Sequence, residues 1–235
     1  KNVKELSEIS HQFDRDGEYQ INVEAKDAAG NAADTQTLLF TLDYIEPELS
    51  ITGVSDAEHY RTDKPVSMKT ADRNIDLTQT ELKVVRNGQP YKIGNPELKD
   101  KTAAEKNFTF SQEGSYVIDL NTTDKAGNSK KHDKVAFIID KTNPVVKIDG
   151  VENNSFNPEN KNVTISIDEL NYETNDVSVS ATKDGAAFSI GSWKNTGKLS
   201  KLGYNFNRDG LYTIQATAKD KAGNGPIAEK RRCRK

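Results

Sequence analysis

The chain has 235 residues, of which 34% are hydrophobic and 29% charged, and its formal net charge at pH 7 is −3. A slightly acidic chain lacks the basic surface of a nucleic-acid-binding protein, and no apolar run is long enough for a membrane-spanning helix. The single cysteine, Cys233, excludes an internal disulfide framework but leaves an extracellular location open.

The first 43 residues contain the first copy of a segment that occurs three times. The copies cover residues 13–31, 110–128 and 206–224, and they start 97 and 96 residues apart. In each copy Gly follows Phe by four residues, Tyr follows Gly by two, Asp follows Tyr by eight, and Gly-Asn closes the segment. This spacing is the length of one small β-sandwich domain and exceeds that of a solenoid repeat. The sequence therefore predicts a tandem array.

Each copy predicts a strand followed by a hairpin turn. From the tyrosine onward, alternate residues form an inward face, which is the period of a half-buried strand. The inward residues are Tyr19, Ile21, Val23 and Ala25 in the first copy, Tyr116, Ile118, Leu120 and Thr122 in the second, and Tyr212, Ile214, Ala216 and Ala218 in the third. The following Asp-x-Ala-Gly-Asn favours a turn, because Asp bonds its own backbone and Gly and Asn tolerate positive φ.

Residues 1–43 match only the C-terminal part of a repeat. Residues 1–13 align without gaps on residues 194–206, so strands E, F and G are expected while strands A to D are missing. Three strands with one apolar face are marginal alone, and we expect them to need a partner surface from a neighbouring domain or another chain. Because the sequence enters a repeat in its middle, we expect a piece of a longer protein.

Residues 44–140 are predicted to form a complete domain. Its linker, residues 43–47, corresponds to residues 140–144, and proline favours a short, fairly stiff junction that sets the domains end to end. The expected strands lie at residues 49–51, 66–70, 82–86, 91–93, 108–110, 116–122 and 135–139. Asn87-Gly88 is a strong signal for a two-residue hairpin turn.

Residues 141–235 repeat this plan with a weak or truncated last strand. The expected strands lie at residues 145–148, 163–167, 177–181, 188–190, 204–206 and 212–218, with a turn at Asp184-Gly185. Pro226 and the basic residues 230–235 replace the apolar run that ends the middle repeat, so we expect a solvated tail there. No segment has the 3.6-residue period of a helix.

Gly-x-Tyr entering a strand that ends in Asp-x-Ala-Gly-Asn resembles the FG hairpin of bacterial immunoglobulin-like (Ig-like) repeats, and the resemblance covers nearly the whole chain. It implies an all-β fold of tandem Ig-like β-sandwich domains arranged end to end. It also implies a corner tyrosine two residues after a glycine; these pairs are Gly17 and Tyr19, Gly114 and Tyr116, and Gly210 and Tyr212. The acidic residue lies three positions before each tyrosine and not four, as in antibody domains, which leaves the partner of the hydroxyl open.

The sequence contains no motif of a catalytic nucleophile, no phosphate-binding loop and no zinc motif, so we expect no enzyme activity.

Acidic residues gather in loops at one end of each predicted domain. In an Ig-like topology the BC and FG loops meet the preceding linker. This end gathers Asp43, Glu46, Asp72, Asn74, Asp76, Asp124 and Asn128 in the second repeat and Asp140, Asp168, Glu169, Asn171, Asp220 and Asn224 in the third. Such oxygen ligands fit Ca²⁺ at the domain junctions, as in similar tandem adhesins, but the same residues are also common turn formers, and both interpretations stay open.

The resemblance implies a non-enzymatic stalk or spacer, with an adhesive surface, in a large bacterial protein that is secreted or attached to the cell wall. Its partners would be neighbouring repeats of the same chain and a host or glycan ligand. The alternative is a set of accessory modules of an extracellular polysaccharide-active enzyme, which space its catalytic domain or hold carbohydrate. A glycan site needs exposed planar rings, for which Trp193, Tyr172 and Tyr91 are the candidates.

Overall fold

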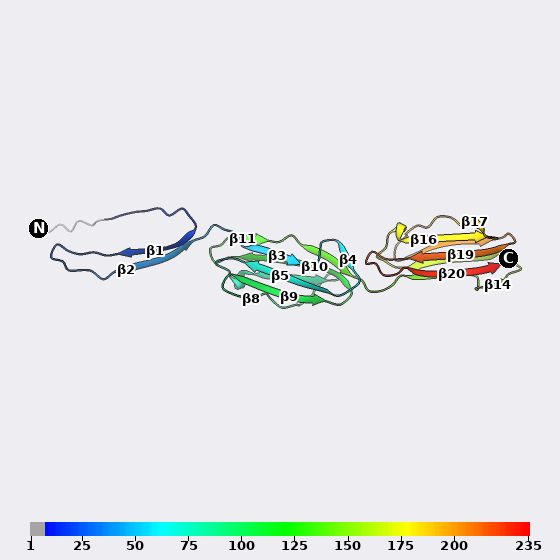
Figure 1. Ribbon diagram of the computed structural model, residues 1–235, viewed down its shortest axis with the longest axis horizontal. Helices are drawn as coiled ribbons and strands as arrows, with labels where there is room; N and C mark the ends of the chain where they lie inside the picture. Colours follow the sequence, from blue (N-terminus) through cyan, green and yellow to red (C-terminus); the bar gives the residue numbers. More distant parts are fainter. Residues whose placement is uncertain (1–7) are drawn as a thin grey trace.

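The computed structural model describes residues 8–235 and shows three β-rich units that follow one another along the long axis of the molecule (Figure 1). We call them unit 1 (residues 8–43), unit 2 (residues 44–140) and unit 3 (residues 141–235). The described residues form twenty strands, and their only helical segments are two 3-10 turns of three residues each. The predicted all-β fold of tandem Ig-like sandwiches is confirmed.

Unit 1 is a hairpin of two antiparallel strands, β1 (Gly17–Val23) and β2 (Gln36–Leu42). The rings of Phe13, Tyr19 and Phe40 pack with centroids 4.7 to 5.1 Å apart, but Val23 and Leu39 are 56% and 69% exposed. Strands F and G of the predicted half-domain are thus present. The predicted strand E falls partly on residues 1–7, which lie outside the described residues, and residues 8–13 form no strand. Within the described part of the chain no second sheet covers this hairpin.

Unit 2 is a sandwich of two sheets. One sheet has the strand order β3-β5-β9-β8, and the other has the order β4-β12-β10-β6-β7, with β11 pairing with the end of β10. The strands are β3 (Glu48–Thr52), β4 (Glu58–Tyr60), β5 (Lys64–Ala71), β6 (Glu81–Arg86), β7 (Gln89–Pro90), β8 (Glu97–Leu98), β9 (Ala103–Phe110), β10 (Gly114–Thr123), β11 (Ser129–Lys131) and β12 (Val135–Ile139). The turn η1 (Leu77–Gln79) joins β5 to β6. β3 pairs with β5 in the first sheet, whereas β4 pairs in parallel with β12 in the second. The start of the domain therefore contributes a strand to each sheet.

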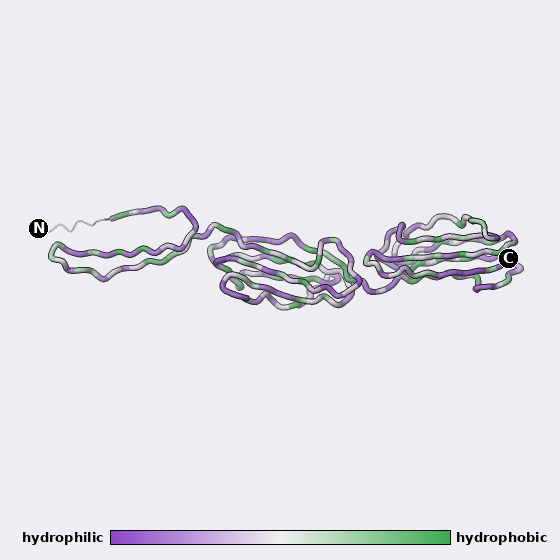
Figure 2. The backbone as a smooth tube through the Cα atoms, viewed as in Figure 1, coloured by the Kyte–Doolittle hydropathy of each residue, from purple (hydrophilic) through white to green (hydrophobic). Residues whose placement is uncertain are grey.

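The core of unit 2 lies between its two sheets and follows the predicted alternation. Tyr116, Ile118 and Leu120 of β10 are fully buried, in one cluster with Met68 of β5 and Phe110 of β9. Figure 2 shows the corresponding alternation of hydrophobic and hydrophilic residues along the strands. Burying one such side chain stabilises a fold by about 1.5 to 3 kcal/mol. A few positions therefore supply much of the stability of a domain with a thin core.

Unit 3 repeats this sandwich. Its sheets have the orders β13-β15-β18 and β14-β20-β19-β16-β17. The strands are β13 (Val145–Asp149), β14 (Ser155–Phe156), β15 (Lys161–Asp168), β16 (Val177–Lys183), β17 (Ala186–Phe188), β18 (Leu199–Phe206), β19 (Leu211–Ala218) and β20 (Ile227–Arg234), and the turn η2 (Thr174–Asp176) precedes β16. Unlike unit 2, unit 3 has no strand at the place of β8 in its first sheet, within residues 8–235.

The prediction of a weak last strand and a solvated basic tail was wrong. β20 has eight residues and pairs with β19 along its whole length. Cys233 lies opposite Tyr212, as Phe137 lies opposite Tyr116 in unit 2, and it is buried. Burial raises the pKa of its thiol. Two residues in the same inward register are charged and form an ion pair of 2.8 Å, Glu229 with Arg231, which hid the alternation.

Candidate functional site

Three carboxylates meet where the first linker enters unit 2. Asp43 directly follows β2 and begins the linker, Asp72 follows β5, and Asp124 follows β10 in the hairpin turn. One oxygen atom of each lies within 4.8 Å of the others, and Asp43 and Asp124 are buried. The predicted convergence of the linker, the BC loop and the FG loop is therefore present in the structure.

Asparagine amides hold these carboxylates together. Nδ2 of Asn128 donates to Oδ2 of Asp124 (2.8 Å) and to the carbonyl oxygen of Asp43 (3.0 Å). Nδ2 of Asn74 donates to Oδ2 of Asp43 (2.6 Å), and its backbone N–H donates to Oδ1 of Asp72 (2.6 Å). The linker is thus bonded to both loops of the domain that follows it. We call this set of residues the junction cluster.

The same junction cluster recurs at the entrance of unit 3. Asp140, Glu169 and Asp220 again offer oxygen atoms within 4.8 Å of one another. Nδ2 of Asn224 donates to the carbonyl of Asp140 (2.7 Å) and to Oδ2 of Asp220 (2.6 Å), and Nδ2 of Asn171 donates to Oδ2 of Asp140 (2.7 Å). Bonds that are reproduced between the same positions of two repeats indicate a shared construction of both junctions.

Burial and mutual repulsion raise the pKa of one acid in each cluster. Burial raises the pKa of Asp72, an N–H bond from Asn74 opposes this shift, and the charges of Asp43 and Asp124 add to it. Glu169 has a raised pKa for the same reasons, with burial first and the charges of Asp140 and Asp220 after it. Each cluster is therefore a place where positive charge would be favourable.

The hairpin turn of unit 1 shows that the Asp-x-Ala-Gly-Asn sequence forms the same turn where no junction cluster is present among the described residues. Asp27 accepts bonds from the backbone and the amide of Asn31 (2.8 and 2.7 Å), as Asp124 does from Asn128. This turn is exposed. The Asp and Asn pair is thus a turn former in its own right, and the junction cluster adds the linker and a second loop to it.

Three predicted residues lie outside the clusters. Asp76 caps the turn η1 by accepting the backbone N–H of Thr78 (2.9 Å). Asp168 is the exposed last residue of β15. Because successive side chains of an extended chain point to opposite sides, its neighbour Glu169 points inward and contributes to the cluster instead. Glu46, the third, forms an exposed ion pair with Lys130 (2.7 Å).

The corner tyrosines donate to the carbonyl four residues earlier. The bonds run from Tyr19 to Arg15, from Tyr116 to Gln112 and from Tyr212 to Arg208, at 2.8, 2.7 and 2.8 Å. The acid three residues before the tyrosine has another role, which the sequence did not reveal. Asp16 accepts the backbone N–H of Tyr44 (2.7 Å), and Glu113 accepts that of Lys141 (2.7 Å). It binds the linker that leaves the domain.

The aromatic residues proposed for a glycan platform are not exposed. Trp193 is 9% and Tyr172 3% exposed, and both belong to the core of unit 3, where the hydroxyl of Tyr172 contacts Oγ of Ser200 (2.7 Å). Tyr91 is half-buried against Phe108 and other rings of unit 2. These three candidates therefore form no exposed planar surface, because the loops that carry them fold against the cores of their units.

Two-sheet units with corner tyrosines and bonded linkers define an array of Ig-like sandwich modules. The sequence agrees: the profile of the bacterial Ig-like domain (group 3) matches residues 104–231, and that of a bacterial Ig-like domain matches residues 12–44 and 52–141. The chain therefore belongs to the bacterial Ig-like domain family. This fold supports a structural or spacer module, and such domains are typically non-catalytic and often extracellular.

Similar solved structures include fibronectin(III)-like modules of Clostridium thermocellum CbhA, at 15% identity, with 80% of this chain and 93% of that chain covered and a TM-score of 0.32. An I-band fragment from titin is 12% identical, with 82% of this chain and 65% of that chain covered and a TM-score of 0.39. No curated protein sequence matches this one. The described residues include no helix that is long and apolar enough to span a membrane.

Proposed function

We propose that the chain is a stiff spacer in the stalk of a bacterial surface protein, without catalysis of its own. The observation that supports this is the two-sided bonding of each linker. The unit after the linker binds it through the junction cluster, and the unit before it binds it through Asp16 or Glu113. A linker that is bonded on both sides loses torsional freedom, so consecutive domains should move as one rod.

The junction between units 2 and 3 has further contacts. Nζ of Lys141 contacts Oδ1 of Asp63 and the carbonyl of Ser111, both at 2.5 Å. Nη1 of Arg61 donates to the carbonyl of Gly223 in unit 3 (3.2 Å), which joins the two domains directly. A rod of this kind holds a terminal domain away from a cell wall. Secretion or wall attachment, neighbouring repeats as partners, and an adhesive role of the exposed faces are part of this proposal.

We further propose that Ca²⁺ binds in the two junction clusters. The residues fit this ion, because each cluster offers three carboxylates with oxygen atoms within 4.8 Å of one another. The amides of Asn74 and Asn128 already donate to Asp43 and Asp124, so these asparagines act as donors and the carboxylates supply the ligand atoms. A carboxylate oxygen accepts more than one bond, which leaves lone pairs for an ion. Bound Ca²⁺ would replace repulsion with ligation at the linker.

Small-angle scattering and thermal unfolding of the full chain test both proposals separately. A chain with Asn128→Ala and Asn224→Ala should have a shorter mean maximum dimension than the wild type, because its linkers bend. An unchanged dimension would contradict the stiff spacer.

Extracellular modules bind Ca²⁺ at about 10⁻⁴ to 10⁻³ M, so millimolar Ca²⁺ should raise the melting temperature of the wild type and of the control variant Asp76→Asn. It should not raise that of a chain with Asp72→Asn and Glu169→Gln. Equal melting temperatures of the wild type with Ca²⁺ and with chelator would contradict the proposal of Ca²⁺ binding, but they would not affect the proposal of a stiff spacer.

A further inference from the structure

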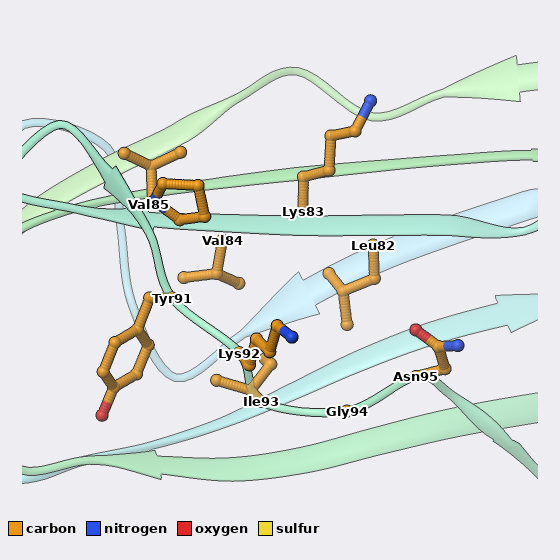
Figure 3. Close-up of a pocket in the computed structure, with 10 residues that line it drawn as sticks. Leu82, Lys83, Val84, Val85, Tyr91, Lys92, Ile93, Gly94 and Asn95 are labelled. Atoms are coloured by element: carbon orange, nitrogen blue, oxygen red, sulfur yellow. The ribbon is translucent and has the colours of Figure 1, made fainter.

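Unit 2 has an open apolar groove between β6 and the segment that follows β7. Its volume is 440 Å³, within the range of about 300 to 1,000 Å³ of small-ligand pockets. Figure 3 shows Leu82 and Val84 pointing from β6 toward Ile93, with Tyr91 at one end, while Lys83 points away from them. Val84 and Ile93 are buried, whereas Leu82 and Tyr91 are only half-buried. We call this the β6 groove.

The β6 groove lies along a free strand edge. β7 has only two residues and pairs with Val85 and Arg86, so no strand among the described residues pairs with the first half of β6 on that side. The carbonyl of Val84 accepts the N–H of Tyr91 (2.8 Å), which shows that the backbone groups of Val84 face away from β10. Two residues earlier, the N–H and C=O of Leu82 face the same way. Unpaired groups on a strand edge are a template for a further strand.

In unit 3, a tryptophan side chain occupies the region that corresponds to the β6 groove of unit 2. Ile190 follows the β16-β17 hairpin as Ile93 follows that of β6 and β7, and three residues later unit 3 has Trp193 where unit 2 has Pro96. In unit 3 the indole is in the same core cluster as Ile190. In unit 2 the chain instead crosses to the other sheet as β8, which pairs with β9. The repeat with a core tryptophan thus closes this side of its sandwich, whereas the repeat without it has a groove.

The rim of the β6 groove carries positive charge without matching carboxylates. Lys92 is exposed, and Nζ of Lys106 lies over Gly94, 2.9 Å from where a Cβ atom would be. Neither lysine takes part in an ion pair among the described residues, while Lys83 is neutralised by Glu81 at 2.5 Å. An occupant with carboxylates beside an apolar group would match this rim.

We propose that the β6 groove binds an extended acidic peptide segment of another protein. The segment adds as a strand beside β6 through the backbone of Leu82. It inserts one aromatic side chain between Leu82, Val84 and Ile93, and it places a carboxylate next to Lys92 or Lys106. This binding site goes beyond the spacer role, because it does not involve the linkers or the junction clusters.

Nuclear magnetic resonance of the ¹⁵N-labelled full chain tests the site with a defined probe, the acetylated and amidated peptide Asp-Val-Trp-Val-Asp. Saturable shifts should appear at Leu82, Val84 and Ile93. Replacing the peptide tryptophan with alanine should weaken binding about tenfold or more, as truncation of a buried aromatic anchor does. Lys92→Glu should weaken binding, and Lys147→Glu, an exposed lysine of β13 in unit 3, is the matched control that should not. Because Lys92 is exposed, this variant leaves the fold intact.

A second variant supplies the missing ring from within the chain. Pro96→Trp places an indole where unit 3 has Trp193 and should abolish binding of the peptide. If this variant does not fold, the pair Lys92→Glu and Lys147→Glu still decides the question. The proposal is overturned by absence of shifts at about 2 mM peptide, a concentration that would occupy most sites even if the dissociation constant were about 1 mM. Equal binding of the alanine peptide, shifts confined to unit 3, or saturation by a neutral oligosaccharide but not by the peptide would also overturn it.

Discussion

Replacing Asn224 with alanine tests the junction cluster at its most buried point. The amide of Asn224 donates to Oδ2 of Asp220, a residue that is 2% exposed, and to the carbonyl of Asp140. A hydrogen bond to a charged group contributes about 1.5 to 3 kcal/mol and one between neutral groups about 1 kcal/mol. Asn224→Ala should therefore lower the free energy of unfolding of unit 3 by about 3 kcal/mol. For a domain of this size, that corresponds to a fall in melting temperature of about 12 °C or more.

Trp193 makes the measurement specific to unit 3. It is the only tryptophan of the chain, and it belongs to the core of that unit. Its fluorescence during urea unfolding, with chelator present, should report the loss in Asn224→Ala. The matched control is Asn128→Ala, which removes the equivalent bonds from unit 2 and should leave the Trp193 transition in place. A loss below about 0.5 kcal/mol, the range of neutral surface substitutions, or an equal shift in both variants would refute the reasoning.

Three further predictions concern the glycine before the corner tyrosine, an acid of the cluster and the N-terminal hairpin. Gly114 has φ +146° and an added Cβ atom would lie 2.7 Å from Oδ1 of Asn87, so Gly114→Val should cost unit 2 about 1 to 3 kcal/mol. Gly203→Ala, where the nearest atom is 3.9 Å away, is the control in thermal unfolding, and equal melting of both variants would contradict the prediction. The raised pKa of Glu169 means that its ionisation destabilises the folded state, a cost that is absent below the ordinary carboxyl pKa of about 4.3 and grows as the pH rises through the raised value. Glu169→Gln should then be more stable than the wild type at pH 7 and equal to it near pH 4 in urea titrations, and a constant difference across this range would speak against the electrostatic cause. Backbone amides of β1 should exchange hydrogen faster than those of β10, because no second sheet covers the described hairpin; equal protection in a monomer would show that the hairpin is stable alone.

The strands could be predicted where local periodicity and burial agree. In β10 and β19 every second residue from Tyr116 and Tyr212 is apolar or small, and the structure buries these residues. β20 was missed because Glu229 and Arg231 take two positions of the inward register, where their ion pair makes the charge tolerable. A pattern of hydrophobicity cannot show that two charged residues neutralise each other.

The candidate site could be predicted as a group of loops but not residue by residue. Which acids converge depends on the path of each loop: Asp76 is used to cap η1, and Asp168 is turned outward by the strand that it ends. The core position of Trp193 could not be predicted, because its loop has no periodic pattern that would place it in the core. The role of Glu113 could not be predicted either, since its partner is a backbone N–H of the linker 28 residues away.

The boundary between units 2 and 3 in the sequence does not coincide with the boundary in their hydrogen-bond pattern. Asp140 directly follows β12, the last strand of unit 2, yet its carboxylate and carbonyl accept bonds from Asn171 and Asn224 of unit 3. The next residue, Lys141, is bonded back to Glu113 of unit 2. Adjacent residues are thus held by opposite neighbours, and bending the junction must break bonds on one side or the other. If the array is the stiff spacer that we propose, its stiffness should follow from these hydrogen bonds as well as from the prolines, at each linker that carries this pair of residues.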